Sequence, residues 1–253
     1  MTTLALSPWH PRALTRVWSE LIAFLRRPEP DAAMGLTPWA KIHGTLAVLL
    51  LKLIAVLALA LFAGVLDLDP QNISAERLQR LYSPLGLLLV GALILPLLEE
   101  TAFRLALRFA PAYLALALGV FTYYLMSKVI YQARISDIET AFVMRVGVAG
   151  AVAVLGYAVL WRPDVATRLR RFWAQHFAVV FYGSAVAFAA IHAFNYVLTP
   201  LTVLLLPLIT LPQFIGGLCY GYIRVRFGFS YAYGFHALSN ALAIGLALLA
   251  PGD

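Results

Sequence analysis

Seven long apolar segments constrain this chain of 253 residues more than any other feature. Each is long enough to cross the hydrocarbon core of a bilayer as an α-helix, which takes about 20 apolar residues. We place the segments near residues 43–66, 84–108, 111–130, 140–160, 175–197, 201–223 and 229–250. The sequence therefore predicts an all-α fold, a polytopic transmembrane helix bundle with about seven spans.

The composition agrees with a chain dissolved mainly in lipid. Hydrophobic residues make up 62% of the sequence and charged residues only 12%, whereas soluble domains carry about 25% charged residues. The net charge of +7 does not indicate nucleic-acid binding, because the cations lie in short loops between apolar segments and not on one folded surface. We expect the lipid bilayer as a partner and no nucleic acid.

The distribution of cations over the loops predicts the orientation. The loops and helix ends on one side hold thirteen cations, and those on the other side hold four. Cytoplasmic loops carry the excess of Lys and Arg, so we expect an N-terminus in, C-terminus out arrangement, in a bacterial cytoplasmic membrane. The expected inner cations are Arg12, Arg16, Arg26, Arg27, Lys41, Arg104, Arg108, Arg162, Arg168, Arg170, Arg171, Arg224 and Arg226; the outer ones are Arg77, Arg80, Lys128 and Arg134.

The segment 1–42 differs from the transmembrane domain, 43–253, in being largely polar. Its apolar residues recur at helical spacing with charges between them, which predicts an amphipathic helix on the inner membrane surface. An irregular polar tail is the alternative. The apolar positions are Trp9, Leu14, Val17, Trp18, Leu21, Ile22 and Leu25.

Glycines predict close helix packing at two places. Gly217 and Gly221 form a small-xxx-small step, and Gly147, Gly150 and Gly156 recur along another segment. Both patterns predict that a neighbouring helix approaches closely.

Ionisable residues within an apolar segment are costly and therefore candidates for function. Glu99 and Glu100 directly follow the apolar run that begins at Pro84, and Arg104 follows Glu100 by four residues. That spacing allows Glu100 and Arg104 to pair on one helix face, while Glu99 points elsewhere. Alternatively, the span ends at Leu98 and both carboxylates reach the interface.

Two further polar pairs lie in later segments. Phe188 and His192 are four residues apart, and so are His236 and Asn240. A lone histidine can be a satisfied structural residue, and a His/Asn pair can hold neighbouring helices together. Taken with the glutamates, however, the set supplies a base, a group to hold water and donors for an oxyanion, which is what peptide hydrolysis requires.

The three motifs, in this order on separate segments, resemble those of the CPBP family, which includes CAAX prenyl endopeptidases and bacterial proteins described as bacteriocin-processing or immunity factors. They read Glu99-Glu100-Thr-Ala-Phe-Arg104, Phe188-Ala-Ala-Ile-His192 and His236-Ala-Leu-Ser-Asn240, and the resemblance covers about 84–250. Two departures stand out. The interval between the first two motifs is longer by about two helices, roughly 111–160, and Leu105 replaces a frequent glycine.

The resemblance implies an intramembrane glutamic protease that needs no cofactor and cleaves a membrane protein or peptide. Glu99 would be the general base and His192 would help to position the attacking water. His236 and Asn240 would donate hydrogen bonds to the oxyanion. The substrate, the cleavage site and the oligomeric state are left open.

We also count Glu100 among the catalytic residues, with Arg104 and Phe188 as structural ones. Two alternatives remain. Glu99, His192 and His236 offer zinc one carboxylate and two imidazoles, and a non-catalytic binding or immunity protein could keep the same cluster. The expected helix boundaries also place His192 roughly 10–15 Å too far outward to meet the other groups.

Overall fold

The computed structural model describes residues 11–30, 35–65 and 71–249, and these residues form helices and no strand. Seven helical stretches are long and apolar enough to cross a membrane, as the sequence predicts. Each overlaps one of the predicted spans. They are Pro38–Val65, Pro84–Leu107, Pro111–Ile130, Phe142–Leu160, Phe177–Asn195, Pro200–Arg226 and Phe229–Leu249.

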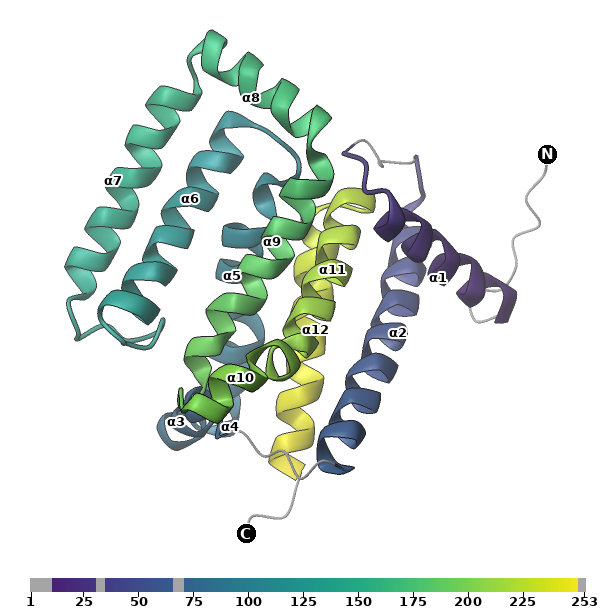
Figure 1. Cartoon of the computed structure of the whole chain (residues 1–253), viewed down its shortest axis with the longest axis vertical. Helices are drawn as coiled ribbons and strands as arrows, with labels where there is room; N and C mark the ends of the chain where they lie inside the picture. Colours follow the sequence, from purple (N-terminus) through teal and green to yellow (C-terminus); the bar gives the residue numbers. More distant parts are fainter. Residues whose placement is uncertain (1–10, 31–34, 66–70, 250–253) are drawn as a thin grey trace.

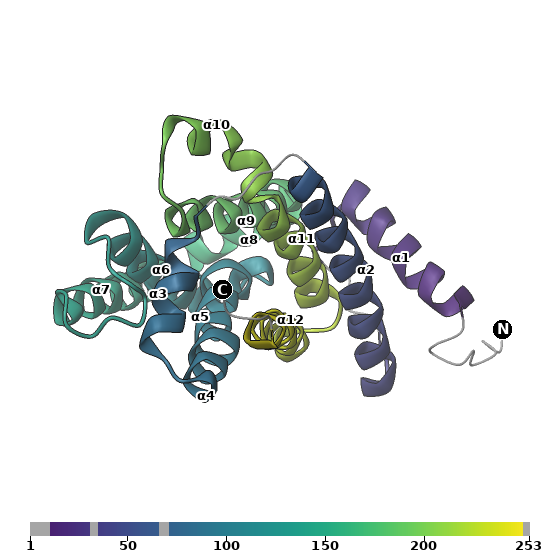
Figure 2. The same cartoon turned by 90° about the horizontal axis from the view of Figure 1, so that it is seen from below.

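The spans form a bundle with a central group and two flanks (Figures 1 and 2). At the centre, α5 (Leu95–Phe103), α9 (Phe177–Ile191), α11 (Leu211–Arg226) and α12 (Phe229–Leu249) pack together. The hairpin of α6 (Pro111–Leu125) and α7 (Phe142–Leu160) lies on one side of this group, and α2 (Pro38–Val65) lies on the other. The two helices 111–160, which the family resemblance lacks, are therefore a flank packed on α5.

Short helices cover the two ends of the bundle. At one end lie α1 (Pro11–Arg26) and α8 (Pro163–Gln175), and at the opposite end lie α3 (Ile73–Leu81) and α4 (Pro84–Leu87) (Figure 1). The loop 131–141 joins α6 to α7 at the same end as α3. Exposed Arg168, Arg170 and Arg171 all lie on α8, so the arginine-rich end of the bundle is the one that the sequence assigns to the inside.

The amphipathic helix of the N-terminal segment is α1, and it packs against the bundle itself. Leu21 and Phe24 are buried, and the Trp18 indole donates a hydrogen bond to the Ala47 carbonyl of α2 at 2.8 Å. The Tyr182 hydroxyl of α9 donates to the Leu25 carbonyl. The apolar face of α1 thus covers protein, which differs from a helix that rests on lipid alone. Trp9, predicted on the same face, lies outside the described residues.

The sixth predicted span is two helices. α10 (Pro200–Ile209) is followed by Thr210, and α11 begins at Leu211, with Pro212 in its first turn. Figures 1 and 2 show α10 turned away from the axis of α11. A proline cannot donate to the preceding turn, which permits the change of direction.

The predicted close packing of helices is confirmed at one of the two glycine patterns and is wrong at the other. A Cβ at Gly217 would lie 3.2 Å from Ala185 of α9, and one at Gly221 would lie 2.7 Å from the Phe181 ring, so both glycines do permit close packing. Around Gly147, Gly150 and Gly156 no described atom lies within 4 Å of the added Cβ. On the α6–α7 contact the small residue is instead Gly119, whose Cβ would meet Ala149 and Ala153.

Two of the thirteen cations assigned to the inner loops are buried. Arg104 has no exposed surface and Arg224 is 4% exposed, because both take part in the packing around the end of α5. When these two are left out, eleven cations remain on the side predicted to be inner and four on the side predicted to be outer. The charge bias therefore still favours the same orientation.

Candidate active site

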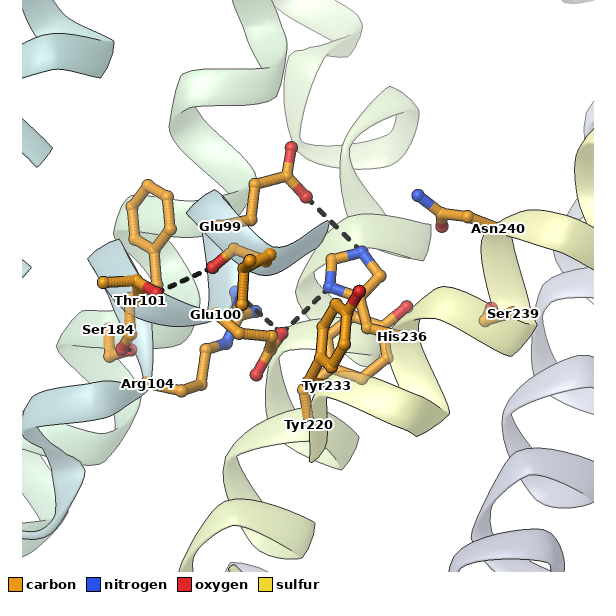
Figure 3. A network of polar contacts seen from close by, with 12 residues as sticks. Glu99, Glu100, Thr101, Arg104, Ser184, Tyr220, Tyr233, His236, Ser239 and Asn240 are labelled. Atoms are coloured by element: carbon orange, nitrogen blue, oxygen red, sulfur yellow. Dashed lines mark hydrogen bonds and ion pairs between the residues drawn. The ribbon is translucent and has the colours of Figure 1, made fainter. Parts of the chain in front are cut away.

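Glu99 lies on α5 between the two histidines that the sequence singles out. Its carboxylate oxygens are 3.9 Å from His192 Nε2 and 3.4 Å from His236 Nε2. All three side chains are largely buried, at 12%, 15% and 4% exposure. Helices α5 and α12 and the residue that follows α9 thus bring together groups that are far apart in the sequence. Figure 3 shows Glu99 of α5 beside His236 of α12.

Glu100 is fully buried and lies next to His236. His236 Nδ1 is 2.9 Å from Glu100 Oε1, and Arg104 Nη1 is 3.6 Å from the same oxygen (Figure 3). The predicted pair of Glu100 and Arg104 is therefore present, and His236 bridges both carboxylates. The alternative in which the span ends at Leu98 is wrong, because α5 continues to Phe103 and buries Glu100 inside the bundle.

The Arg104 guanidinium is held among aromatic rings. Its central carbon lies 3.7 Å from the Phe188 ring centroid and 5.3 Å from that of Tyr220. A cation over a desolvated ring face gains about 2 kcal/mol. Phe188, which the motif predicts to be a structural residue, therefore stacks on Arg104.

The end of α5 is fixed by side chains from other helices. The last four carbonyls of a helix have no partner within it, and the carbonyls of the short turn that follows α5 also need partners. Ser184 donates to the Phe103 carbonyl, and Arg224 donates to the carbonyls of Arg104 at 3.2 Å and Leu105 at 2.9 Å. Trp173 donates to the Ala106 carbonyl at 2.9 Å. These bonds explain why Arg224 is buried, and they hold the Glu99–Arg104 segment rigidly against α9 and α11.

His192 ends α9 and has a defined tautomer. Its Nδ1 lies 2.7 Å from the Phe188 carbonyl. A carbonyl only accepts, so Nδ1 carries a proton, and in the neutral ring Nε2 has the free lone pair. That lone pair belongs to the nitrogen 3.9 Å from Glu99, so one water can donate to both groups.

Asn240 is held one turn further along α12, by a carbonyl released from helix η1. η1 (Leu88–Ile94) is a π-helix, in which the Leu95 N–H bonds back five residues to the Val90 carbonyl. The next donor in this register would be Pro96, which has no N–H. The Gly91 carbonyl is therefore left free by Pro96, and it accepts a hydrogen bond from Asn240 Nδ2 at 3.0 Å. One N–H of the Asn240 amide remains for another acceptor.

A cavity of about 90 Å³ adjoins Glu99 and His192. A water needs roughly 10–15 Å³ of such volume, so several waters fit. The walls come from α3, α5, the α6–α7 hairpin and η4 (His192–Asn195), and they include Ser74, Tyr124, Lys128, Arg134 and Asn195. The Glu99 carboxylate and the His192 imidazole thus face a space that water can occupy, whereas His236 and Asn240 are not among the residues that line it.

The expected mismatch in depth between His192 and the other two groups does not occur. Figure 1 shows α9 crossing the bundle obliquely, so its rise along the bundle axis is smaller than 1.5 Å per residue. His192 therefore reaches the level of Glu99 even though it is the residue that follows the last turn of α9.

Two residues beside His236 are among the contributors that escaped the sequence analysis. The Tyr220 ring stacks on His236 at 4.2 Å between centroids, and no sequence signal separates it from other core aromatics. Lys52 of α2 donates to the Tyr220 hydroxyl at 3.1 Å and also to the Ser239 hydroxyl. A lysine in the middle of an apolar span is itself a signal, but its partners lie on helices that only the fold brings near.

No protein-family model, no curated protein and no solved structure matches this chain. Within the described part of the chain, no group of three or more His, Cys, Asp or Glu side chains is arranged to hold a metal ion.

Proposed function

We propose that this chain is an intramembrane endopeptidase of the CPBP type, which hydrolyses a peptide bond of a membrane protein or peptide. The observation that carries the proposal is the position of the Glu99 carboxylate, 3.9 Å from His192 Nε2 and 3.4 Å from His236 Nε2, at the wall of a cavity within the spans. A carboxylate buried among the spans is costly, and hydrolysis is a reason to keep it.

Water is activated between Glu99 and His192. A water that donates one hydrogen bond to each group needs its acceptors about 4–4.5 Å apart, which is close to the 3.9 Å between Glu99 Oε1 and His192 Nε2. The water oxygen attacks the carbonyl carbon while Glu99 takes the proton. Glu99 then passes this proton to the leaving amine, so the base returns to its ionised form.

The oxyanion is stabilised from α12. When both ring nitrogens of His236 carry protons, Nδ1 donates to Glu100 and Nε2 lies 3.4 Å from the Glu99 carboxylate. Once Glu99 has taken the proton from the water, the Nε2 N–H turns its hydrogen bond to the developing charge. Asn240 offers the N–H that Gly91 does not use. Donors that are already oriented in a low-dielectric site contribute about 3 kcal/mol each. Glu100 acts in this scheme by holding His236 and pairing with Arg104.

The test is a comparison of peptide fragments from membranes that contain the wild type, Glu99→Ala or Glu76→Gln. Glu76 lies on α3 in an exposed pair with Arg80, so its variant controls for loss of a glutamate as such. We expect membrane-proximal fragments in the wild type and Glu76→Gln samples that disappear with Glu99→Ala. Identical fragment sets in all three samples would refute a proteolytic role and favour a binding or immunity protein.

Zinc is the second candidate, on one specific observation. Both imidazoles have Nδ1 on an acceptor and Nε2 toward Glu99, which is how histidines are oriented in many zinc sites. These three described side chains are not arranged to hold a metal ion in this structure, so zinc would have to draw Glu99, His192 and His236 closer together, and it would then activate the water itself. One equivalent of zinc in the purified wild type, lost in His236→Ala but kept in Asn240→Ala, would replace the metal-independent mechanism by this one.

We further propose a bacterial cytoplasmic membrane as the location, with the end of the bundle that carries α8 inside. The charge bias of the loops supports this orientation. The cavity beside Glu99 lies toward the other end, next to α3.

A further inference from the structure

The cavity beside Glu99 carries more positive than negative charge on its walls. Lys128 and Arg134 both line it, and Glu99 is its one carboxylate among the described residues. Lys128 Nζ donates to Asn195 Oδ1 at 2.8 Å and to Ser74 Oγ at 3.3 Å, and both of these partners are neutral. Neither cation has an ion pair within 4.0 Å to a described carboxylate.

With His192 neutral, the cavity walls therefore hold two positive charges and one negative one. A net charge in a partly buried, low-dielectric space is costly unless an opposite charge is near. A ligand with one negative charge would bring the balance to zero. This imbalance is the first argument for an anionic ligand.

The positive wall is also rigidly built. Arg145, fully buried, donates from Nη1 to the Arg134 carbonyl at 3.1 Å and from Nη2 to the Asp137 carbonyl. The Tyr123 hydroxyl donates to the Ile135 carbonyl at 2.6 Å. The loop that presents Arg134 is thus pinned at three carbonyls, and this degree of preorganisation is typical of a binding site.

We propose that Lys128 and Arg134 form a subsite for a carboxylate of the peptide substrate, beside the bond that Glu99 hydrolyses. The inference rests on the proposed function. The carboxylate comes from the C-terminus of the peptide or from an acidic side chain, and it is bound by charge-assisted hydrogen bonds. Both cations lie in the segment 111–160 that the family resemblance lacks, so the added helical hairpin sets the specificity of this enzyme.

The subsite can be tested by binding, without turnover. Three dansylated peptides of one apolar sequence are compared: a free acid, its C-terminal amide, and an amide with Asp as the last residue. Each is titrated, by fluorescence anisotropy, into purified full-length Glu99→Gln in lipid nanodiscs. We expect the free acid or the Asp peptide to bind about 10- to 100-fold more tightly than the neutral amide, and the tighter of the two identifies the source of the carboxylate.

Variants in the same Glu99→Gln background assign the effect to the two cations. Lys128→Gln and Arg134→Gln should each reduce the preference at least several-fold, and Lys128→Arg should retain it. Arg80→Gln is the matched control, because Arg80 is exposed at the same end of the bundle on α3, and it should leave the preference unchanged. Thermal melting of each variant checks its fold. If Lys128→Gln does not fold, the result for Arg134→Gln is the test of the subsite.

Equal affinity for the three peptides, or no binding of any of them, would overturn the subsite. So would an unchanged preference in folded Lys128→Gln and Arg134→Gln. These outcomes are separate from failure of the proposed function, which appears as the absence of Glu99-dependent fragments, because anion binding does not require cleavage.

Discussion

At the scale of the residue, Arg104 shows how a charge is kept deep in the bundle. One carboxylate, Glu100, lies 3.6 Å from its guanidinium, and the Phe188 ring lies 3.7 Å from its central carbon. A planar guanidinium can stack on a ring and face a carboxylate at the same time, whereas a lysine ammonium has no flat face.

Arg104→Lys should therefore lower the free energy of unfolding by about 2 kcal/mol, the value of a desolvated cation–π contact. Thermal melting in nanodiscs measures this, with Arg80→Lys as the exposed control. A melting temperature equal to that of the wild type would mean that the stacking on Phe188 does not stabilise the fold.

Asn240 has two possible roles, and kinetics separates them. As an oxyanion donor it acts in the transition state, so Asn240→Ala should lower kcat by about 10²–10³ with little change in KM. As the partner of the Gly91 carbonyl it contributes only about 1 kcal/mol of stability. A lower melting temperature with unchanged kcat would assign Asn240 to packing alone.

At the scale of the element, the loop 131–141 joins α6 to α7 at the end of the bundle that carries α3, and it carries backbone strain. Ala141 precedes α7 as its N-cap, at φ 47° and ψ 31°, in the left-handed region. The N–H groups of Thr140 and Glu139 donate to the Asp137 carboxylate and hold its pKa below the usual range. The loop is thus fixed by local bonds as well as by Arg145.

Ala141→Gly should stabilise the protein. The left-handed conformation costs a residue with a Cβ about 1–2 kcal/mol, and the greater freedom of glycine in the unfolded chain cancels about 0.5–1 kcal/mol of the gain. We expect a net gain of about 0.5–1 kcal/mol in thermal unfolding. Ala110→Gly is the matched control, since Ala110 precedes α6 at φ −143° and should show no gain.

Helical periodicity explains which parts of the site the sequence could predict. The pairing of Glu100 with Arg104 follows from a spacing of four within one helix. The bridge from His236 to both glutamates does not, because it depends on how α12 packs against α5. Pro96 was the available signal for a break in the hydrogen bonding of its span, although the π-helix itself and its bond to Asn240 required the coordinates.

At the scale of the whole molecule, the length of the apolar segments predicted the seven spans, because a helix needs about 20 apolar residues to cross the hydrocarbon core of a bilayer. The place of the α6–α7 hairpin could not be predicted in the same way. The sequence of an apolar segment does not determine which neighbouring helix it packs against. The contribution of Lys128 and Arg134 to the cavity was therefore not foreseen.

The orientation is testable with single cysteines in a Cys219→Ala background, since Cys219 is buried. Glu139 lies in the loop beside α3 and Arg168 lies on α8, and both are exposed. Glu139→Cys and a cysteine at Asp253, which lies outside the described residues, should react with an impermeant maleimide on intact cells. Arg168→Cys should react only after permeabilisation. Labelling of Arg168→Cys and Glu139→Cys from the same side would contradict the arrangement.

The central claim, that Glu99 is the base, is tested most directly by the turnover of Glu99→Gln in nanodiscs on a substrate found by fragment analysis. The amide keeps the volume of the carboxylate but cannot take a proton, and loss of a general base costs about 10²–10⁴ in rate. We expect kcat to fall by at least about 10², with a melting temperature that confirms the fold. Turnover close to that of the wild type in folded Glu99→Gln would contradict the mechanism.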